Sequence, residues 1–412
     1  MKKASIISVG NELLAGQSLD TNKAYLSTQL LSMGIPVVCG YTVGDDVEMI
    51  ADAITQAVSH ADIVIITGGL GPTADDLTRQ GLAHFMGIEL QFKDDLLRQI
   101  ADFFNKRNIK MTETNKTQAY LPAGTEALKN RLGTAPGIKA EYQDKLIVAL
   151  PGPPAEMKPM FRESVADRLG VLAAGQVVII GKIHCFGTGE SVIAQKLDSL
   201  MKRQRNPLIN CTVSDGIITL HIVATAKSKH DAEKMIEEDA DKISSLLGDL
   251  VYGRDGQTLA QIVGSELARR KKTLSLAESC TGGLIAKLIT DIPGASEYLT
   301  CGWVTYANEA KIIQLGVDRK LIERYGAVSE QVGRAMATAA RERADTDFAI
   351  AVTGIAGPSG ETEQKPLGLV YITVESPRRQ QFERFVFSAS RDRVRRSAAL
   401  NALNMLRLEL ET

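Results

Sequence analysis

The chain contains 412 residues, of which 44% are hydrophobic and 24% charged, and its formal net charge at pH 7 is −1. This length exceeds what one hydrophobic core usually organises, so we expect two or three domains. The near-zero charge provides no general attraction to nucleic acid or to membrane surfaces, and we expect neither as a partner. No stretch is long and apolar enough to span a bilayer, and the 5 cysteines include no C-x-x-C pair, which is typical of a cytoplasmic protein with reduced thiols.

Residues 1–170 alternate buried-strand patterns with helical patterns, which indicates a doubly wound α/β sheet. The expected strands are Ile6–Val9, Pro36–Val43, Ala61–Thr67 and Lys145–Leu150. Ligands of such sheets bind beyond the carboxyl ends of the strands. We therefore expect the loops that follow these strands to meet at one site.

Glycines and carboxylates share these loops. Gly68, Gly69 and Gly71 would let backbone N–H groups approach a phosphate closely. Neighbouring carboxylates would repel a diphosphate unless a divalent cation bridged the two, so the sequence predicts a metal site. The candidate metal ligands are Glu12, Asp20, Asp45 and Asp76. The alternative is that Thr73 and Asp76 form a capping box for a helix that starts at residues 74–76.

Four motifs in this region together resemble the CinA family. They occupy residues 10–16 (GNELLAG), 20–22 (DTN), 68–76 (GGLGPTADD) and 151–157 (PGPPAEM). The resemblance implies a fold similar to the molybdopterin-binding MoaB/MogA proteins and a metal-dependent ADP-ribose pyrophosphatase, with Mg, Mn or Co as the divalent metal. A molybdopterin-binding module joined to a regulatory domain without turnover is the alternative. The candidates for nucleotide binding are Gly68, Gly69, Gly71, Thr73, Asn22, Glu156 and Lys158.

The middle segment, residues 171–252, has the pattern of a βαββα module. The expected elements are Val177–Phe186, Glu190–Lys202, Leu208–Val213, Ile217–Ala226 and Lys229–Leu247. This order resembles the KH-like domain of the CinA family. RNA-clamping KH domains use a basic G-x-x-G loop, whereas residues 187–190 read GTGE. We therefore expect a spacer or dimer-forming element, and the resemblance implies a homodimer.

The last domain, residues 253–412, is organised around Ser279. A strand pattern at Thr273–Ala277 precedes this serine and a helical pattern at Leu284–Ile289 follows it. Backbone N–H groups and the positive end of a helix dipole converge at such a junction, which can hold an oxyanion and activate a hydroxyl. The alternatives are that Ser279 or Thr281 only caps the helix, or that Cys280 is the nucleophile.

No histidine is found after residue 252, so a Ser-His-Asp triad within the last domain is excluded and the base must be a lysine, a tyrosine or a carboxylate. Further strands are expected at Trp303–Tyr306, Asp347–Val352 and Gly368–Val374, with a final helix at Arg391–Leu408. These patterns predict a second α/β unit with its own glycine-rich loops at the strand ends.

Four motifs of this domain resemble the CinA C-terminal domain, a nicotinamide-nucleotide amidohydrolase. They are residues 278–283 (ESCTGG), 306–311 (YANEAK), 326–329 (GAVS) and 353–358 (TGIAGP). The resemblance implies that nicotinamide mononucleotide is deamidated without a cofactor, with Ser279 as the nucleophile and Tyr306 and Lys311 activating it. Ala307 stands where the family often has serine.

The remaining candidate residues of this domain are expected to bind the substrate. The N–H groups of residues 280–283 are expected to stabilise the oxyanion, and residues 353–357 with Arg391 to bind the phosphate. The alternative for the basic cluster at 391–396 is a solvated helix face. The substrate-binding candidates are Cys280, Thr281, Gly282, Gly283, Ser329, Thr353, Gly354, Ala356, Gly357 and Arg391.

Overall fold

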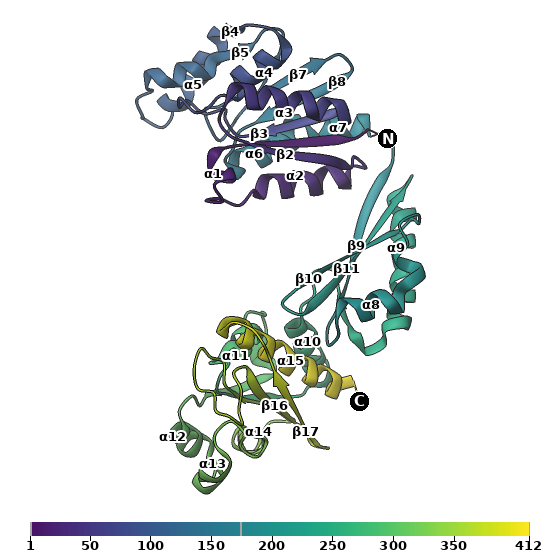
Figure 1. The fold of residues 1–412 in the computed structure, drawn as a ribbon, viewed down its shortest axis with the longest axis vertical. Coiled ribbons are helices and arrows are strands. Elements are labelled where there is room, and N and C mark those ends of the chain that lie inside the picture. Colours follow the sequence, from purple (N-terminus) through teal and green to yellow (C-terminus); the bar gives the residue numbers. More distant parts are fainter. Residues whose placement is uncertain (1, 174, 412) are drawn as a thin grey trace. The chain divides into compact units, whose positions relative to one another are not determined.

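The computed structural model describes residues 2–173 and 175–411 (Figure 1). Contacts between residues divide the chain into two compact units, Met1–Ile179 with Ala224–Met235 and Ile180–Val223 with Ile236–Thr412. Each unit is described by itself below. Within the described ranges, no helix has the length and apolar character needed to cross a membrane.

The N-terminal unit contains a six-stranded sheet in the order β2-β1-β3-β8-β7-β6. Neighbouring strands from β2 to β8 are parallel, whereas β7 and β6 are antiparallel to their neighbours. The strand bounds are β1 Ala4–Val9, β2 Val37–Val43, β3 Ile63–Thr67, β6 Glu126–Leu128, β7 Gly137–Tyr142 and β8 Lys145–Leu150. All four predicted strands therefore form, and their carboxyl ends share one edge of the sheet.

Helices cover both faces of this sheet because alternate residues of each strand point to opposite sides. Ile6 packs in one core with α2 and α6, and Ile7 in the other core with α3 and α4. Figure 1 shows α2 and α3 on opposite faces of the sheet. The helices are α1 Asn11–Leu14, α2 Thr21–Ser32, α3 Val47–His60, α4 Thr78–Met86, α5 Asp94–Asn105, α6 Pro154–Ser164 and α7 Ala166–Leu172. A small two-stranded antiparallel sheet, β4 Leu90–Phe92 with β5 Tyr120–Pro122, follows α4, and α5 lies between its two strands in the chain.

The middle module has a four-stranded sheet in the order β10-β11-β9-β12. Its strands are β9 Val177–Cys185, β10 Leu208–Ser214, β11 Ile217–Ala226 and β12 Val251–Arg254, and its helices are α8 Glu190–Leu197 and α9 Lys229–Leu247. The predicted helix over 190–202 ends early, because a 3-10 turn at Asp198–Met201 replaces its last part. The strand β12, which sequence patterns missed, pairs with β9 and leads into the last domain.

The C-terminal domain has a five-stranded sheet in the order β14-β13-β15-β16-β17. The first three strands are parallel and the last two antiparallel. The strands are β13 Leu274–Glu278, β14 Leu299–Val304, β15 Phe348–Gly354, β16 Leu369–Glu375 and β17 Gln380–Val386. The helices are α10 Leu259–Arg270, α11 Leu284–Thr290, α12 Asn308–Ala310, α13 Arg319–Tyr325, α14 Glu330–Ala344 and α15 Arg391–Glu411, and a π-helical turn spans Lys311–Leu315.

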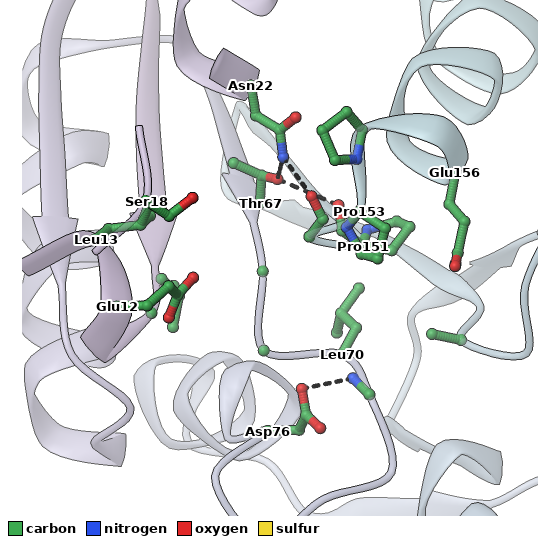
Figure 2. Close-up of a pocket in the computed structure, with 18 of the residues that line it drawn as sticks. Glu12, Leu13, Ser18, Asn22, Thr67, Leu70, Asp76, Pro151, Pro153 and Glu156 are labelled. Atoms are coloured by element: carbon green, nitrogen blue, oxygen red, sulfur yellow. Dashed lines mark hydrogen bonds between the residues drawn. The ribbon is translucent and has the colours of Figure 1, made fainter. Parts of the chain in front are cut away.

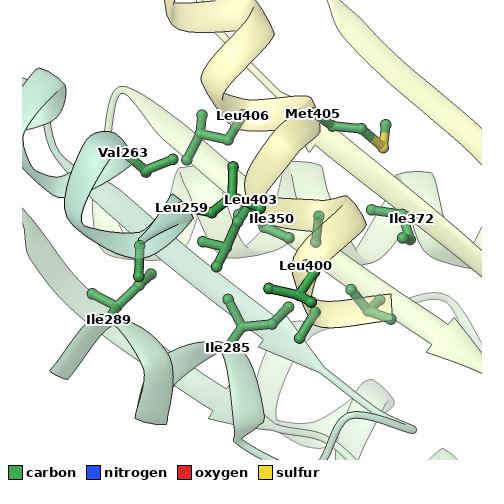
Figure 3. Close-up of a cluster of buried hydrophobic side chains, with 14 of the residues drawn as sticks. Leu259, Val263, Ile285, Ile289, Ile350, Ile372, Leu400, Leu403, Met405 and Leu406 are labelled. Atoms are coloured by element: carbon green, nitrogen blue, oxygen red, sulfur yellow. The ribbon is translucent and has the colours of Figure 1, made fainter. Parts of the chain in front are cut away.

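The long helix α15 forms the centre of this domain's larger core. Figure 3 shows Leu400, Leu403 and Leu406 of α15 beside apolar side chains of α10 and α11, with Ile350 and Ile372 from the sheet behind them. The same core includes Phe186, which follows β9 of the middle module. The middle module and the C-terminal domain therefore share buried apolar surface, which explains why they fall largely into one compact unit.

Candidate functional sites

Ser279 lies at the carboxyl end of β13, where the chain turns toward α11. Its N–H donates to the Val352 carbonyl at 2.9 Å, which ties the serine to the neighbouring strand β15. Gly282 (φ 60°) and Gly283 (φ 88°) make the turn into α11, because their left-handed backbone favours glycine. The serine is 8% exposed. The sequence therefore correctly placed Ser279 at a strand end before a helix.

Lys311 places its amine beside this serine. Its Nζ lies 3.1 Å from Ser279 Oγ and donates to the carbonyls of Thr305 at 2.8 Å and Tyr306 at 3.3 Å. The side chain is 1% exposed, and burial lowers the pKa of Lys311 to about 8. A neutral amine has two N–H bonds and one lone pair, and the two carbonyls can only accept. The lone pair is then free to accept the proton of the Ser279 hydroxyl, as a general base does.

Glu278 is the last residue of β13, and its carboxylate lies at the start of α11. Sequence analysis missed Glu278 as a functional residue. Its buried carboxylate accepts hydrogen bonds from Ile285 N at 3.1 Å and Ala286 N at 2.8 Å. These donors follow residues 280–283, whose N–H groups are the predicted oxyanion donors. The Gly282 N–H, one of the predicted oxyanion donors, bonds to the Ser279 carbonyl at 3.1 Å. The N–H groups of Cys280, Thr281 and Gly283 remain as candidates.

Cys280 is poorly suited to be the nucleophile. The side chain is 4% exposed, and burial raises the pKa of its thiol to about 12. The thiol therefore stays protonated near neutral pH, whereas the attacking species would have to be a thiolate. This leaves the Ser279 hydroxyl as the better candidate.

Tyr306 contributes its backbone and its side chain to different contacts. The predicted strand over 303–306 ends at Val304, and Thr305 N donates to the Glu278 carbonyl at 2.8 Å. The carbonyl of Tyr306 accepts from Lys311, but its ring is 57% exposed. Its hydroxyl accepts from Arg391 Nη2 at 2.8 Å. The structure thus brings Lys311 to Ser279 and holds the Tyr306 hydroxyl on Arg391 at the start of α15.

Several predicted substrate-binding residues hold the fold together instead of presenting free donors. The Thr353 hydroxyl donates to the Ala327 carbonyl at 2.8 Å. Ser329 caps α14, with its Oγ accepting from Val332 N at 3.3 Å. Gly354 lies within β15, where a Cβ would come within 2.7 Å of the Leu369 carbonyl. Ala356 is buried, while the Gly357 carbonyl accepts from Arg391 Nη1 at 2.5 Å.

Arg395, one turn after Arg391, is a further residue that sequence analysis missed. Its Nη2 donates to the Thr281 carbonyl at 2.8 Å, which fixes the loop that carries Ser279. We considered the cluster at 391–396 to be a solvated helix face. The structure shows two of its guanidinium groups bonded to the loops around Ser279.

The predicted N-terminal site coincides with a cavity of about 430 Å³ beyond the carboxyl ends of the parallel strands (Figure 2). Figure 2 shows Glu12 and Glu156 on opposite sides of this cavity. The predicted site residues that line it are Glu12, Asp20, Asn22, Asp45, Gly68, Gly69, Gly71, Asp76 and Glu156. Two predicted residues point elsewhere: the Thr73 hydroxyl donates to Asp76 at 2.5 Å, and Lys158 Nζ lies 5.1 Å from the centre of the Tyr25 ring.

The predicted helix start at residues 74–76 is wrong, because α4 begins at Thr78. Asp76 accepts from the N–H groups of Gly71 at 2.7 Å and Thr73 at 2.9 Å, so its carboxylate closes a loop and caps no helix. Arg79, which is 2% exposed, donates to the carbonyls of Leu70 at 2.7 Å and Gly71 at 2.8 Å. Burial lowers the pKa of Arg79 to about 10. This buried arginine fixes the glycine-rich loop, and no sequence pattern pointed to it.

The other predicted metal ligands also have structural partners. Asp20 caps α2 through Lys23 N at 2.9 Å, and Asp45 accepts from Asn11 N at 2.9 Å. Across residues 2–173 and 175–411, no group of three or more His, Cys, Asp or Glu side chains is placed to hold a metal ion. Mg²⁺ commonly uses only one or two carboxylates together with substrate phosphates. The oxygen-rich lining fits a metal of that kind, bound with its substrate.

Asn22 joins two of the strand-end loops. Its Nδ2 donates to Thr67 Oγ1 at 2.9 Å and to the Gly152 carbonyl at 2.6 Å. Its Oδ1 is buried at the cavity without a hydrogen-bond partner among the described residues. A buried acceptor left open in this way can take a hydrogen bond from a bound ligand or water.

Three family models match successive parts of the chain. Residues 5–170 match the "Probable molybdopterin binding domain", residues 182–253 the "Damage-inducible protein CinA KH domain", and residues 256–410 the "CinA C-terminal domain". The protein is thus a three-domain α/β protein with a MoaB/MogA-like first domain, a KH-like middle domain and a CinA C-terminal domain.

The chain is similar to curated relatives over nearly its full length. A CinA-like protein of Dictyoglomus thermophilum is 42% identical over 405 residues, which cover 98% of each chain. A second one, from Dictyoglomus turgidum, is 41% identical over 406 residues and again covers 98% of each chain. The structure described as the protein CinA with unknown function from Thermoplasma acidophilum is 35% identical, with a TM-score of 0.38, over 40% of this chain and 97% of that one. The chain belongs to the CinA family.

Proposed function

We propose that the C-terminal domain deamidates nicotinamide mononucleotide with Ser279 as nucleophile and Lys311 as base. The observation that carries this proposal is the 3.1 Å contact between Lys311 Nζ and Ser279 Oγ, together with the burial that lowers the pKa of Lys311 to about 8. About one tenth of such lysines are neutral at pH 7, against fewer than one in a thousand for an ordinary lysine. General-base catalysis of this kind typically accelerates a reaction 10²–10⁴-fold.

The chemistry follows from these positions. Ser279 Oγ attacks the carboxamide carbon and its proton passes to Lys311 Nζ. The C–N bond then breaks, and the leaving nitrogen takes that proton and departs as ammonia. A water molecule then attacks the resulting nicotinoyl ester and Lys311 accepts its proton; the bond between the acyl carbon and Ser279 Oγ breaks, and the proton passes to Ser279 Oγ, which restores the hydroxyl. N–H groups of the 280–283 loop are candidates to stabilise the oxyanion in both steps.

The test measures ammonia released from nicotinamide mononucleotide by the wild type and Ser279→Ala. We expect the variant to lose activity roughly a thousandfold or more, because the reaction has no other nucleophile. Ser265→Ala on the exposed side of α10 is the matched control and should keep full activity. Full activity in a folded Ser279→Ala protein would refute the mechanism. If Cys280→Ala lost the activity while Ser279→Ala kept it, the thiol would be the nucleophile instead.

For the N-terminal domain we propose hydrolysis of ADP-ribose at its diphosphate, supported by the glycine-rich loop and the carboxylates around one cavity. Glu12, Asp20, Asp45 and Asp76 are the candidate ligands, and one or two of them would hold a divalent metal together with the phosphates of the substrate. Bound Mg, Mn or Co would neutralise the diphosphate and activate a water molecule. Asn22 Oδ1 would accept a hydrogen bond from the substrate, and the N–H groups of the 68–71 loop would donate to phosphate oxygens.

The experiment incubates ADP-ribose with the protein and each of these metals in turn. We expect AMP and ribose 5-phosphate as products, and roughly tenfold or greater loss in Asp45→Asn, which keeps the hydrogen-bond acceptor but removes the charge. The match of residues 5–170 to a molybdopterin-binding domain supports a second candidate, a binding module without turnover. Tight molybdopterin binding with ADP-ribose left intact would favour that candidate.

A further inference from the structure

Two arginines at the start of α15 bond to the loops around Ser279, and no ion pair is described for either of them within residues 175–411. Arg391 donates to the Gly357 carbonyl and the Tyr306 hydroxyl, and Arg395 donates to the Thr281 carbonyl. All hydrogen bonds described for these two side chains within residues 175–411 go to uncharged oxygens. Arg395 lies four positions after Arg391, so the two arginines lie on the same side of the helix, one turn apart. Such a pair matches the charge and planar geometry of a phosphate group.

The Tyr306 hydroxyl is one of the oxygens that a phosphate would displace. It sits 2.8 Å from Arg391 Nη2, and the tyrosine side chain is 57% exposed, so nothing in the packing fixes the ring there. Its backbone is held more firmly, because the Tyr306 carbonyl accepts from the buried Lys311 amine. The ring can therefore swing about its side-chain bonds while the backbone stays beside the lysine.

The bond between Arg391 and Tyr306 is weaker than the bonds a phosphate would make. A guanidinium binds a phosphate through two parallel charge-assisted hydrogen bonds, whereas it binds a neutral phenol through one. A phosphate that arrives at Arg391 would therefore replace the tyrosine. The second Arg391 bond, to Gly357, leaves the guanidinium anchored during the exchange.

Arg391 is already expected to bind the phosphomonoester of the substrate, and we propose that this binding releases the Tyr306 hydroxyl toward the reacting amide. This inference rests on the proposed function of the same site. In the free protein the Tyr306 hydroxyl is held on Arg391. A substrate without a phosphate leaves it there, so the nucleoside analogue reacts slowly even when it is bound.

The first experiment is independent of turnover and measures binding of inorganic phosphate by calorimetry. We expect Arg391→Met to bind phosphate at least about tenfold more weakly than the wild type, and Arg391→Lys to fall between them, because lysine lacks the planar fork. Tyr306→Phe should bind phosphate about threefold or more tightly, since no hydroxyl has to be displaced. Arg393→Met, an exposed arginine of the same helix, is the matched control and should bind as the wild type does.

Unchanged affinity in Arg391→Met would refute the phosphate site, and unchanged or weaker affinity in Tyr306→Phe would refute the displacement. Circular dichroism verifies that each variant is folded. Because these outcomes need no turnover, they decide the inference even if nicotinamide mononucleotide is not a substrate.

The second experiment compares ammonia release from nicotinamide mononucleotide and from nicotinamide riboside. We expect free inorganic phosphate to accelerate the riboside reaction in the wild type, because it fills the site that the riboside leaves empty and frees Tyr306. The acceleration should disappear in Arg391→Met and in Tyr306→Phe. Phosphate that only inhibits the riboside reaction would refute the release of Tyr306. Absence of ammonia from both substrates would refute the proposed function itself.

Discussion

Lys311 combines deep burial with a position beside a serine hydroxyl. Its ammonium form is destabilised because water is excluded, which lowers its pKa to about 8. The lysine becomes a base only when it loses its proton, so activity should rise with pH. We expect kcat/KM for the amide to increase about tenfold per pH unit below pH 8 and to level off above it.

A pH profile from 6 to 10 on nicotinamide mononucleotide measures this dependence. Lys311→Met should lose both the activity and the rising limb, because no other described group contacts Ser279 Oγ as a base. A flat profile in the wild type would contradict the assignment of Lys311. The Ser265→Ala protein should reproduce the wild-type curve.

The sequence predicted some of these residues and missed others for a physical reason. Ser279 was found because a strand pattern, a glycine pair and a helix pattern are all local signals. Lys311 lies 32 residues away, and only the family resemblance connected the two. Thr353 was expected to bind phosphate, but its hydroxyl bonds to Ala327 in the loop between α13 and α14, a contact between distant segments that local patterns do not encode. Glu278 was part of a quoted motif, yet its partners on α11 became visible only in three dimensions.

The short helix α11 depends on Glu278 for its first turn. Glu278→Ala would leave the N–H groups of the buried Ile285 and the half-buried Ala286 without their carboxylate acceptor. Each unsatisfied buried donor costs about 1–3 kcal/mol, so we expect the free energy of unfolding to fall by roughly 2 kcal/mol or more. Because α11 follows the Ser279 loop directly, deamidase activity should fall as well.

Urea denaturation measures this loss. Glu361→Ala removes an exposed carboxylate and should change the free energy of unfolding by less than about 0.5 kcal/mol. Equal stability of Glu278→Ala and Glu361→Ala would contradict the capping role.

Among the elements, regular strands were predicted well and irregular segments were not. The parallel strands β1, β3, β8 and β13 are buried apolar runs, which sequence patterns identify reliably. The acidic segment at 74–76 resembled a helix start. In the structure, however, the Asp76 carboxylate accepts from N–H groups of its own loop, and Arg79 donates to two carbonyls of that loop. Such hydrogen bonds from side chains to the backbone of the same loop compete with helix formation and win at this position.

The middle module and the C-terminal domain share a core through Phe186. This side chain is 4% exposed within the cluster that contains α10, α11 and α15. Arg407 of α15 also donates to the Asp249 carbonyl at 2.5 Å, beside β12. We therefore expect these two parts to unfold together in a single transition.

Phe186→Ala tests this coupling. Removal of a buried phenyl ring typically costs about 3–5 kcal/mol. We expect the variant to lower the melting temperature of the transition that abolishes deamidase activity, although residue 186 lies outside the region that matches the CinA C-terminal domain. Phe92→Ala, which removes a 40% exposed ring from the N-terminal unit, is the control and should leave that transition unchanged. Two separate transitions for the middle module and the C-terminal domain would contradict a shared core.

The protonated, buried thiol of Cys280 also has a practical consequence for chemical labelling. Its pKa of about 12 and its 4% exposure make it inert toward iodoacetamide and similar alkylating reagents. A fluorophosphonate, which reacts with activated serines, meets no competing thiolate at this position. An activity-based probe of that class would therefore report Ser279 directly, even in a cell extract that contains other thiols.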